Sequence, residues 1–195
     1  MITIVYAHPL EEGMNAATRN ALVEHLRAAN QPYNLINLYQ EGFNPVMTME
    51  ERSSFFACAG ESTDPLVQKY QKMLRAADHL VFMFPVWFNE QPAFVKGFFE
   101  RVCLPGFGYT YTGTGTAPLL THIKRLTVIT SSGAPTEMLT AVYDNMIELQ
   151  FIGHVVRIMI GTLTDEDASA WINLGPALPK NLGAHIAAVK ARFSR

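Results

Sequence analysis

The stretch that decides the fold reads Ile2-Thr3-Ile4-Val5-Tyr6-Ala7 and continues as His8-Pro9-Leu10-Glu11-Glu12-Gly13-Met14-Asn15. Its first six residues form a short, almost continuous apolar run, which is typical of a strand buried on both faces of a parallel sheet. A loop containing a glycine follows, and Asn15 is a residue type that caps helices. Beyond it, Leu22, Leu26 and Ala29 share one helical face. The stretch therefore predicts a strand, a loop and a helix in succession.

The same pattern recurs along the chain. Further apolar runs span Leu80 to Phe84, Leu126 to Thr130 and Val155 to Ile160, and a weaker run spans Tyr33 to Leu38. Helix starts are expected at Asp64-Pro65, at Pro92, and at Thr164, which is followed by Asp167 as in a capping box. Five strands that alternate with helices predict right-handed crossovers and a doubly wound α/β sheet.

Length and composition bound the class of protein. The chain has 195 residues, a size that suits one domain spanning residues 1–195, and its 49% apolar content excludes disorder. A net charge of −2 argues against a nucleic-acid binder. We expect no transmembrane segment and no signal peptide, because no apolar run is long enough and the start lacks a basic region and a cleavage site. Two cysteines cannot form a disulfide framework, which favours the reducing cytoplasm.

Ligands of such sheets bind at the carboxyl ends of the strands, so the loops that follow the strands are the candidate sites. In the first loop, His8 can donate to a phosphate, Gly13 lets the backbone approach it, and the helix that follows offers free amide groups. The dinucleotide glycine fingerprint and the P-loop ending are both missing. An ordinary loop with a solvent-facing histidine remains the alternative.

The second loop, Pro85-Val86-Trp87-Phe88-Asn89-Glu90-Gln91, places two aromatic residues after a strand. They can flank a planar ring, or they can pack against a neighbouring helix or subunit. The third loop, Thr130-Ser131-Ser132-Gly133-Ala134-Pro135, is small and polar. It can let a flat ligand approach the main chain, although ordinary turns have the same composition.

A third aromatic segment, Phe107-Gly108-Tyr109-Thr110-Tyr111, lies between these two loops. It can line an apolar pocket for an aromatic substrate or simply cover the sheet. Other chemistries are not supported, since the chain lacks a nucleophile elbow, a zinc-protease motif and any histidine spacing typical of metal ligands. His79 and His122 are better explained by structural roles.

With these segments in place, the chain resembles the flavodoxin-like NAD(P)H:quinone oxidoreductases, the DT-diaphorase family and its bacterial relatives. The matching residues are Tyr6-Ala7-His8-Pro9 through Asn15, Phe84-Pro85, Pro92-Ala93, Lys96-Gly97-Phe98-Phe99-Glu100-Arg101-Val102, Phe107-x-Tyr109-Thr110-Tyr111 and Phe151-Ile152-Gly153. The resemblance implies a flavodoxin-like three-layer α/β sandwich with a five-stranded parallel sheet in the order 2-1-3-4-5.

The resemblance also implies a cofactor, a partner and a site. The family's members are homodimers with the active site at the interface and a bound flavin, FAD in the DT-diaphorase branch and FMN in others, which NAD(P)H reduces before a quinone or similar acceptor is reduced. On this basis His8, Met14 and Asn15 hold the phosphate. Pro85, Val86, Trp87, Phe88, Asn89, Thr130, Ser131, Ser132 and Gly133 hold the ring, and Tyr109, Thr110 and Tyr111 line the acceptor pocket of the partner subunit. No catalytic proton donor is assigned, because Met138 occupies the place of the family's tyrosine.

Two alternative functions stay open from the sequence. An electron-carrying flavodoxin is disfavoured by the nearly neutral charge, since such carriers are usually strongly acidic. A non-catalytic regulatory subunit that senses redox state for a transport system would share the fold and the flavin.

Overall fold

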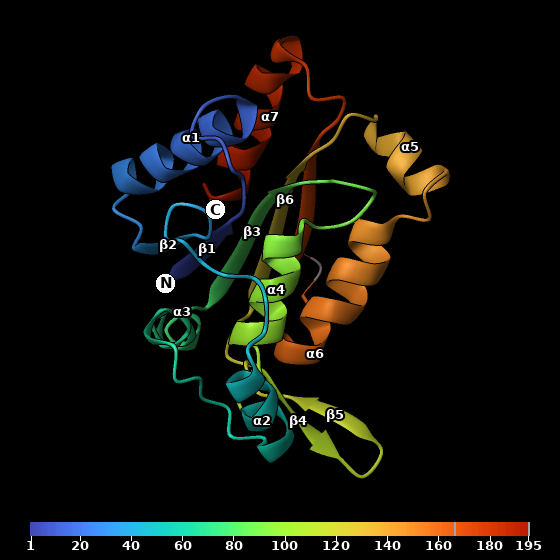
Figure 1. Cartoon of the computed structure of the whole chain (residues 1–195). Helices are drawn as coiled ribbons and strands as arrows, with labels where there is room; N and C mark the ends of the chain where they lie inside the picture. The colour runs from blue at the N-terminus through green and yellow to red at the C-terminus, as the bar shows by residue number, and fades with distance from the viewer. Residues whose placement is uncertain (166, 195) are drawn as a thin grey trace.

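A computed structural model describes residues 1–165 and 167–194. Its centre is a five-stranded parallel sheet in the order β2-β1-β3-β6-β7 (Figure 1). The strands are β1 (Ile2–Tyr6), β2 (Tyr33–Asn37), β3 (His79–Pro85), β6 (Arg125–Ser131) and β7 (Ser169–Leu174). Counted within this sheet alone, the order is the predicted 2-1-3-4-5, so the predicted topology is confirmed.

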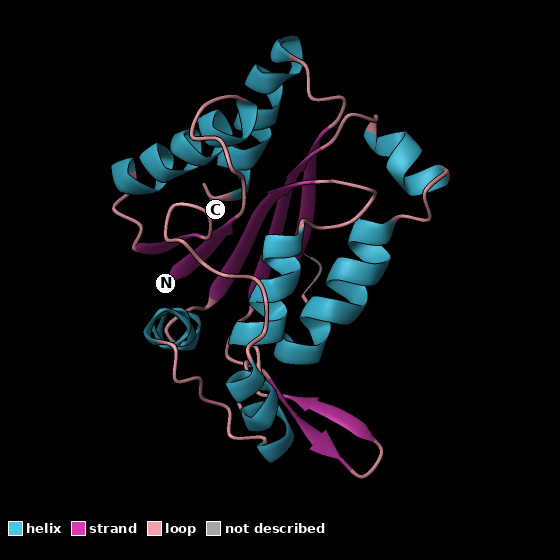
Figure 2. Ribbon diagram, in the orientation of Figure 1, coloured by secondary structure: helices cyan, strands magenta, loops and turns pink. Residues whose placement is uncertain are grey.

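Helices cover both faces of the sheet and a hairpin projects from one end (Figure 2). One face is covered by α1 (Met14–Ala28) and α7 (Pro179–Arg192), and the other by α3 (Pro65–Arg75), α4 (Ala93–Val102) and the π-helix η1 (Ile147–Val156), which continues as α6 (Arg157–Ile160). Near the ends of the sheet lie α2 (Met49–Ala57) and α5 (Thr136–Ala141). The antiparallel hairpin consists of β4 (Tyr109–Thr112) and β5 (Gly115–Pro118). No helix in the described ranges is long and apolar enough to cross a membrane.

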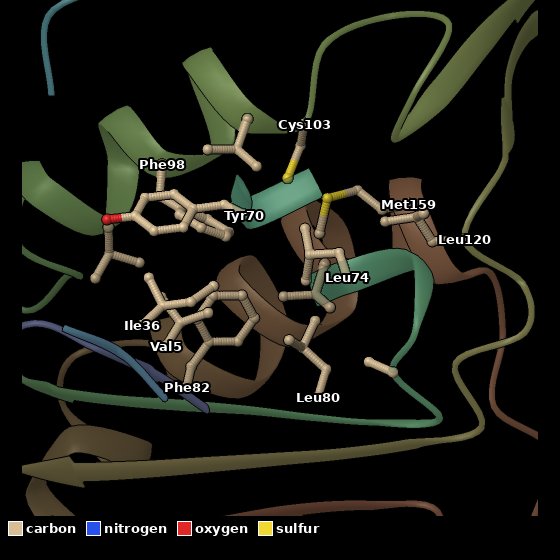
Figure 3. Packing of buried hydrophobic residues seen from close by; sticks show 14 of the residues in the cluster. Val5, Ile36, Tyr70, Leu74, Leu80, Phe82, Phe98, Cys103, Leu120 and Met159 are labelled. Atoms are coloured by element: carbon tan, nitrogen blue, oxygen red, sulfur yellow. The ribbon is translucent and has the colours of Figure 1, made fainter. Parts of the chain in front are cut away.

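The alternation of side chains along the strands builds two hydrophobic cores. Val5, Phe82 and Val128 belong to the core under α3 and α4, whereas Ile4 and Val81 belong to the core under α1 and α7. All five are completely buried. Figure 3 shows the first core, in which Phe82 packs beneath Tyr70 of α3 and Phe98 of α4. Because both faces of the strands are covered, the strands are continuous apolar runs rather than alternating ones.

The strand predicted over Val155 to Ile160 is wrong. These residues complete η1 and form α6, and the fifth strand is β7, an edge strand in which four consecutive residues are only partly buried. A short apolar run does not distinguish a strand from a helix by periodicity alone. The helix expected after Thr164 is also wrong, since β7 begins at Ser169; residue 166 lies outside the described part of this segment.

A buried ion-pair cluster joins α4 to α2 and to the start of α3. The guanidinium of Arg101 in α4 donates to both carboxylate oxygens of Glu51 in α2, at 2.6–2.9 Å, and to Asp64, the N-cap of α3, at 2.8 Å. It also donates to the carbonyl oxygen of Asn44. Both charges of the Arg101–Glu51 pair are 3% exposed, so neither can be satisfied by water if its partner is lost.

The helix α2 was not predicted from the sequence, although it carries a clear start signal. The Thr48 hydroxyl accepts the Glu51 N–H, and the Glu51 carboxylate accepts the Thr48 N–H, which forms a capping box. Burial acts to raise the pKa of Glu51, but the hydrogen bonds from Arg101 and Thr48 outweigh it and hold this pKa below its ordinary value. Glu51 is therefore ionised at neutral pH and serves as both cap and counter-ion.

We expect Arg101→Met to lower the free energy of unfolding by about 3–5 kcal/mol, because it leaves the Glu51 carboxylate buried without a counter-charge. Urea unfolding followed by circular dichroism measures the change. Lys96→Met is the matched control on the same helix, since it removes only the exposed ion pair with Glu100 and is expected to cost less than about 1 kcal/mol. Equal midpoints for the two variants would contradict the role assigned to Arg101.

Candidate functional site

Three loops meet at the carboxyl ends of β1, β3 and β6, beside the point where the strand order reverses. Ser131, the last residue of β6, joins them. Its carbonyl oxygen accepts the Val86 N–H at 2.7 Å, and its hydroxyl donates to the side-chain oxygen of Asn15 at 3.0 Å. One residue thus joins the three loops that the sequence singled out separately as candidate sites.

The first loop leaves the start of α1 open. Gly13 precedes α1 with φ at 89°, and a Cβ built at this glycine would meet no atom within 4 Å. No side chain caps the helix, and its first turn, which includes Met14 and Asn15, holds no acidic residue. Free amide groups and the positive end of a 15-residue helix dipole therefore face open space, an arrangement that suits an anion.

The remainder of the first loop is fixed by ionic and polar contacts. Glu11 forms an ion pair with Arg19 of α1 at 2.8 Å and accepts a hydrogen bond from the side chain of Asn37, at the end of β2, at 3.1 Å. Burial opposes ionisation of Glu11, yet these contacts hold the pKa of its carboxyl below the ordinary value. His8 Nδ1 lies 3.2 Å from both the N–H and the carbonyl oxygen of Leu10, so the contacts of the ring within this loop use Nδ1 and not Nε2.

The second loop is a tight turn that presents aromatic side chains to solvent. Trp87 and Glu90 exchange two backbone hydrogen bonds of 3.0 Å, and Phe88 and Asn89 both have positive φ, at 52° and 66°. These features define a type I′ turn, in which Phe is an uncommon and strained residue. Trp87 is 43% exposed and Phe88 fully exposed, so within one chain Phe88 does not pack against a helix.

The third loop is largely buried, and its residues differ in what they can offer a ligand. Thr130, Ser131 and Ser132 are each at most 6% exposed. The Thr130 hydroxyl accepts from the indole N–H of Trp171 and donates to the side-chain oxygen of Asn173, both at 2.8 Å. Its side chain is thus engaged within the sheet. Ser132 and Gly133 follow it, and a Cβ at Gly133 would meet nothing within 4 Å.

The predicted acceptor-pocket residues Tyr109, Thr110 and Tyr111 lie elsewhere. They form β4, at the end of the molecule opposite the three loops (Figure 1), so a single chain does not bring them to the flavin-binding candidates. The rings of Tyr109 and Tyr111 meet edge to face at 5.6 Å, and Tyr111 is 52% exposed. Burial, with a further contribution from Tyr111, raises the pKa of Tyr109, so this phenol is protonated at neutral pH.

A cleft of about 540 Å³ lies beside this hairpin and was not predicted from the sequence. It is mainly apolar and is lined by residues of α2, α4, η1 and α6 together with Tyr109: Met47, Arg52, Phe55, Lys96, Phe99, Glu100, Cys103, Tyr109, Val155, Ile158 and Met159. The spacing of Lys96, Phe99, Glu100 and Cys103 on one helical face was the available signal. Within residues 1–165 and 167–194, no cluster of histidine, cysteine or acidic side chains is arranged to hold a metal ion.

The sheet order and the loops at its switch point define a doubly wound α/β protein with an uncapped helix start beside exposed aromatic side chains. The family described as having a flavodoxin-like fold matches residues 1–159, and the chain belongs to this family. NAD(P)H dehydrogenase [quinone] 1 of Rattus norvegicus is 32% identical over 145 residues, which cover 67% of this chain and 53% of that protein. The chain thus spans about half the length of the curated relatives it matches.

Solved structures share the fold over nearly the whole chain. The NAD(P)H:quinone oxidoreductase from Methanothermobacter marburgensis superposes with a TM-score of 0.83 at 22% identity, covering 100% of this chain and 98% of that one. An FMN-dependent NADH-azoreductase from Bacillus anthracis, solved with FMN, has a TM-score of 0.70 at 18% identity and covers 100% of this chain and 99% of that one. These likenesses show that the fold is shared along the chain, including the part beyond residue 159.

We expect Phe88→Gly to raise the free energy of unfolding by about 1 kcal/mol, because it removes the strain of a positive φ without removing a buried side chain. Chemical denaturation measures the change. Phe56→Gly is the control: Phe56 is also exposed but lies in the helix α2, where glycine is expected to cost about 1 kcal/mol. Destabilisation by both changes would show that the turn is not strained.

Proposed function

We propose that this protein is a flavin-dependent NAD(P)H oxidoreductase that reduces quinones or similar small acceptors. The observation that carries the proposal is the pair of contacts made by Ser131, which place an open helix start beside two exposed aromatic residues. The names of its relatives support the chemistry, since the rat protein is an NAD(P)H dehydrogenase acting on quinone. Residues 1–195 act in this proposal as one flavin-binding domain in the cytoplasm; two free cysteines, one of them buried, are compatible with that setting.

The first loop fits the phosphate of a flavin. Gly13 leaves space where a side chain would stand, and the N–H groups of Met14 and Asn15 lie in the first turn of α1, near its positive end. His8 can donate from Nε2 in the tautomer in which its Nδ1 accepts the Leu10 N–H. Arg19 and Asn37 hold the loop in place through Glu11, so the phosphate site is prearranged.

The second and third loops fit the ring. The segment Pro85 to Asn89 presents Trp87 and Phe88 as flat apolar surfaces, and Ser131, Ser132 and Gly133 offer main-chain groups at the neighbouring strand end. Thr130 contributes through its main chain, since its hydroxyl is bonded to β7. A bound flavin supplies hydride transfer between the nicotinamide and the acceptor. The chain's own residues hold the ring flat, shield it from water and donate hydrogen bonds to its polar edge.

The flavin in this proposal is FAD, as the resemblance to the DT-diaphorase branch implies. FMN is the alternative, because the azoreductase from Bacillus anthracis was solved with FMN. Heat release of the cofactor followed by mass spectrometry distinguishes the two.

The active unit in this proposal is a homodimer. The three loops and the hairpin lie at opposite ends of one chain, so Tyr109, Thr110 and Tyr111 can reach a bound ring only from a second copy. Several of the apolar side chains that are at least 42% exposed support an interface between copies, among them Phe88, Tyr111, Val142, Leu149 and Ile158. In such a dimer the tyrosines of one subunit cover the acceptor that stacks on the ring held by the other.

We expect the purified protein to take up flavin, to lose its yellow colour when NADH or NADPH is added without oxygen, and to regain it when a benzoquinone is added. Absorbance in a sealed cuvette follows the cycle. A protein that takes up neither FAD nor FMN would contradict the flavin site. A yellow protein that NAD(P)H never bleaches would contradict the enzyme and favour the regulatory alternative.

A pair of glycine variants tests the proposed phosphate site, one as the test and one as its matched control. Gly13→Ala and Gly42→Ala both place a side chain at positive φ, at 89° and 65°, and in both the added Cβ meets nothing within 4 Å. The backbone strain is therefore comparable. Only Gly13→Ala is expected to weaken flavin binding, by about tenfold or more, because only this Cβ would project into the phosphate site.

A hybrid dimer tests whether the site is shared between subunits. We expect Phe88→Gly and Tyr111→Ala homodimers each to keep their flavin and to lose most quinone turnover. A heterodimer of the two variants, isolated with two different affinity tags, is expected to recover about half of the wild-type turnover. One of its two sites then combines an intact Phe88 with an intact Tyr111 from the other subunit.

The same heterodimer also tests the alternative in which each site is formed by one subunit alone. If both residues served the ring of their own chain, every site of the heterodimer would carry one defect, and turnover would stay at the level of the parent homodimers. Size-exclusion chromatography with light scattering confirms that the variants remain dimeric.

A further inference from the structure

A continuous chain of side-chain hydrogen bonds runs from β7 into the third loop. The indole N–H of Trp171 donates to the Thr130 hydroxyl at 2.8 Å, and this hydroxyl donates to the side-chain oxygen of Asn173 at 2.8 Å. The amide nitrogen of Asn173 donates to the Ser132 hydroxyl at 2.9 Å, and Ser132 donates to the carbonyl oxygen of Ala134 at 2.7 Å. The same amide nitrogen also donates to the Thr136 hydroxyl at 3.1 Å.

The two ends of this chain fix its direction. The Trp171 indole can only donate and the Ala134 carbonyl can only accept, so each hydroxyl between them accepts on one side and donates on the other. The Ser132 proton goes to Ala134, because the side-chain oxygen of Asn173 lies farther from it, at 3.3 Å. The amide of Asn173 is thereby held in one orientation, with its oxygen toward Thr130 and its nitrogen toward Ser132 and Thr136. Hydrogen bonds aligned in one direction polarise one another and rigidify the loop.

The backbone around this chain is equally constrained. Ser132 donates its N–H to Leu174 at 3.0 Å, and its carbonyl oxygen accepts the Ala177 N–H at 2.8 Å. In a trans peptide the carbonyl and the following N–H point in opposite directions, so the Gly133 N–H is directed away from Ala177. Gly175 has no room for a side chain, since an added Cβ would lie 2.4 Å from the Ala134 oxygen and 2.5 Å from the Asn173 nitrogen.

We propose that Asn173 is a positioning residue that, through Ser132, aims the Gly133 N–H at the electron-rich edge of the bound ring. The inference rests on the proposed flavin site and adds a residue of β7 to it. A donor aimed at that edge stabilises the ring more when it is reduced and carries negative charge. Asn173 thus acts on the relative affinity for reduced and oxidised flavin, and not merely on the stability of the fold.

The test compares Asn173→Asp with Asn34→Asp in deflavinated protein reloaded with flavin. Aspartate has the shape of asparagine but cannot donate to Ser132 or Thr136. Because it also adds a negative charge, the uncharged variant Trp171→Phe separates loss of the hydrogen-bond chain from the effect of charge. Asn34 is a matched control, because its amide nitrogen also joins two neighbouring strands, donating to the Thr3 hydroxyl at 3.3 Å, away from the loops. The readouts are the dissociation constant of oxidised flavin from fluorescence titration and the ratio of affinities for reduced and oxidised flavin from the midpoint potential.

We expect Asn173→Asp to weaken binding of oxidised flavin about tenfold and to weaken binding of reduced flavin further, while Asn34→Asp changes neither. Trp171→Phe is the second variant in case the carboxylate disrupts folding. It removes the donor that fixes the direction of the chain, and it is expected to shift the affinity ratio in the same sense by a smaller factor. Thermal unfolding confirms that the compared variants are folded.

The outcomes separate this inference from the proposed function. If the wild-type protein binds no flavin, the proposed function fails and the inference fails with it. If the wild-type protein binds flavin and both Asn173→Asp and Trp171→Phe leave the affinity ratio unchanged, only the inference is overturned. If the variants weaken both redox states equally, Asn173 is structural and the positioning role is also overturned.

Discussion

The relative positions of α2, α3 and α4 depend on a single buried guanidinium. Arg101 is the shared partner of Glu51 in α2 and of Asp64 at the start of α3, and it extends from α4. A buried charge is tolerated only with its partners in place, so this cluster holds the three helices in one arrangement. The backbones also pack closely here, because Gly97 of α4 has no side chain: a Cβ built at Gly97 would lie 2.2 Å from the carbonyl oxygen of Pro45. The hairpin with its two tyrosines continues directly from this region.

The other end of the sheet is organised by hydroxyl and amide groups. At the carboxyl end of β6 the apolar residues Val128 and Ile129 give way to the polar residues Thr130 and Ser131, and Ser132 follows the strand. There they bond to α1 and β7, and Val86 bonds to the Ser131 carbonyl. One end of the molecule therefore presents a rigid surface of hydrogen-bond donors that suits a flat ring, and the opposite end presents aromatic side chains on a hairpin. In the proposed dimer, each end supplies a part of the site that the other end of the same chain lacks.

The sequence correctly predicted those strands whose residues carry a local signal. Continuous apolar runs identified β1, β3 and β6, and the chain order of loops placed the site at the switch point. The fifth strand was misplaced because residues 155–160 are more apolar than β7, an edge strand that is only partly buried. Contacts such as Ser131 with Asn15, 116 residues apart, leave no local signal, and neither does the Arg101 cluster that joins residues 37 and 50 positions away.

The turn at Phe88 exposes an aromatic side chain that a ligand or a second subunit could bury. A fully exposed phenylalanine forgoes roughly 1.5–3 kcal/mol of burial, and its positive φ costs about 1–3 kcal/mol more. Neither cost is recovered within one chain, because Trp87 and Glu90 fix the turn in a shape that points Phe88 outward. A ring stacked on the turn, or a second subunit packed over it, would bury the Phe88 side chain and so regain the free energy of burial, while the backbone strain would remain. The strained turn is thus stable enough to persist in the folded chain, and it gains most from the complex in which its aromatic face is buried.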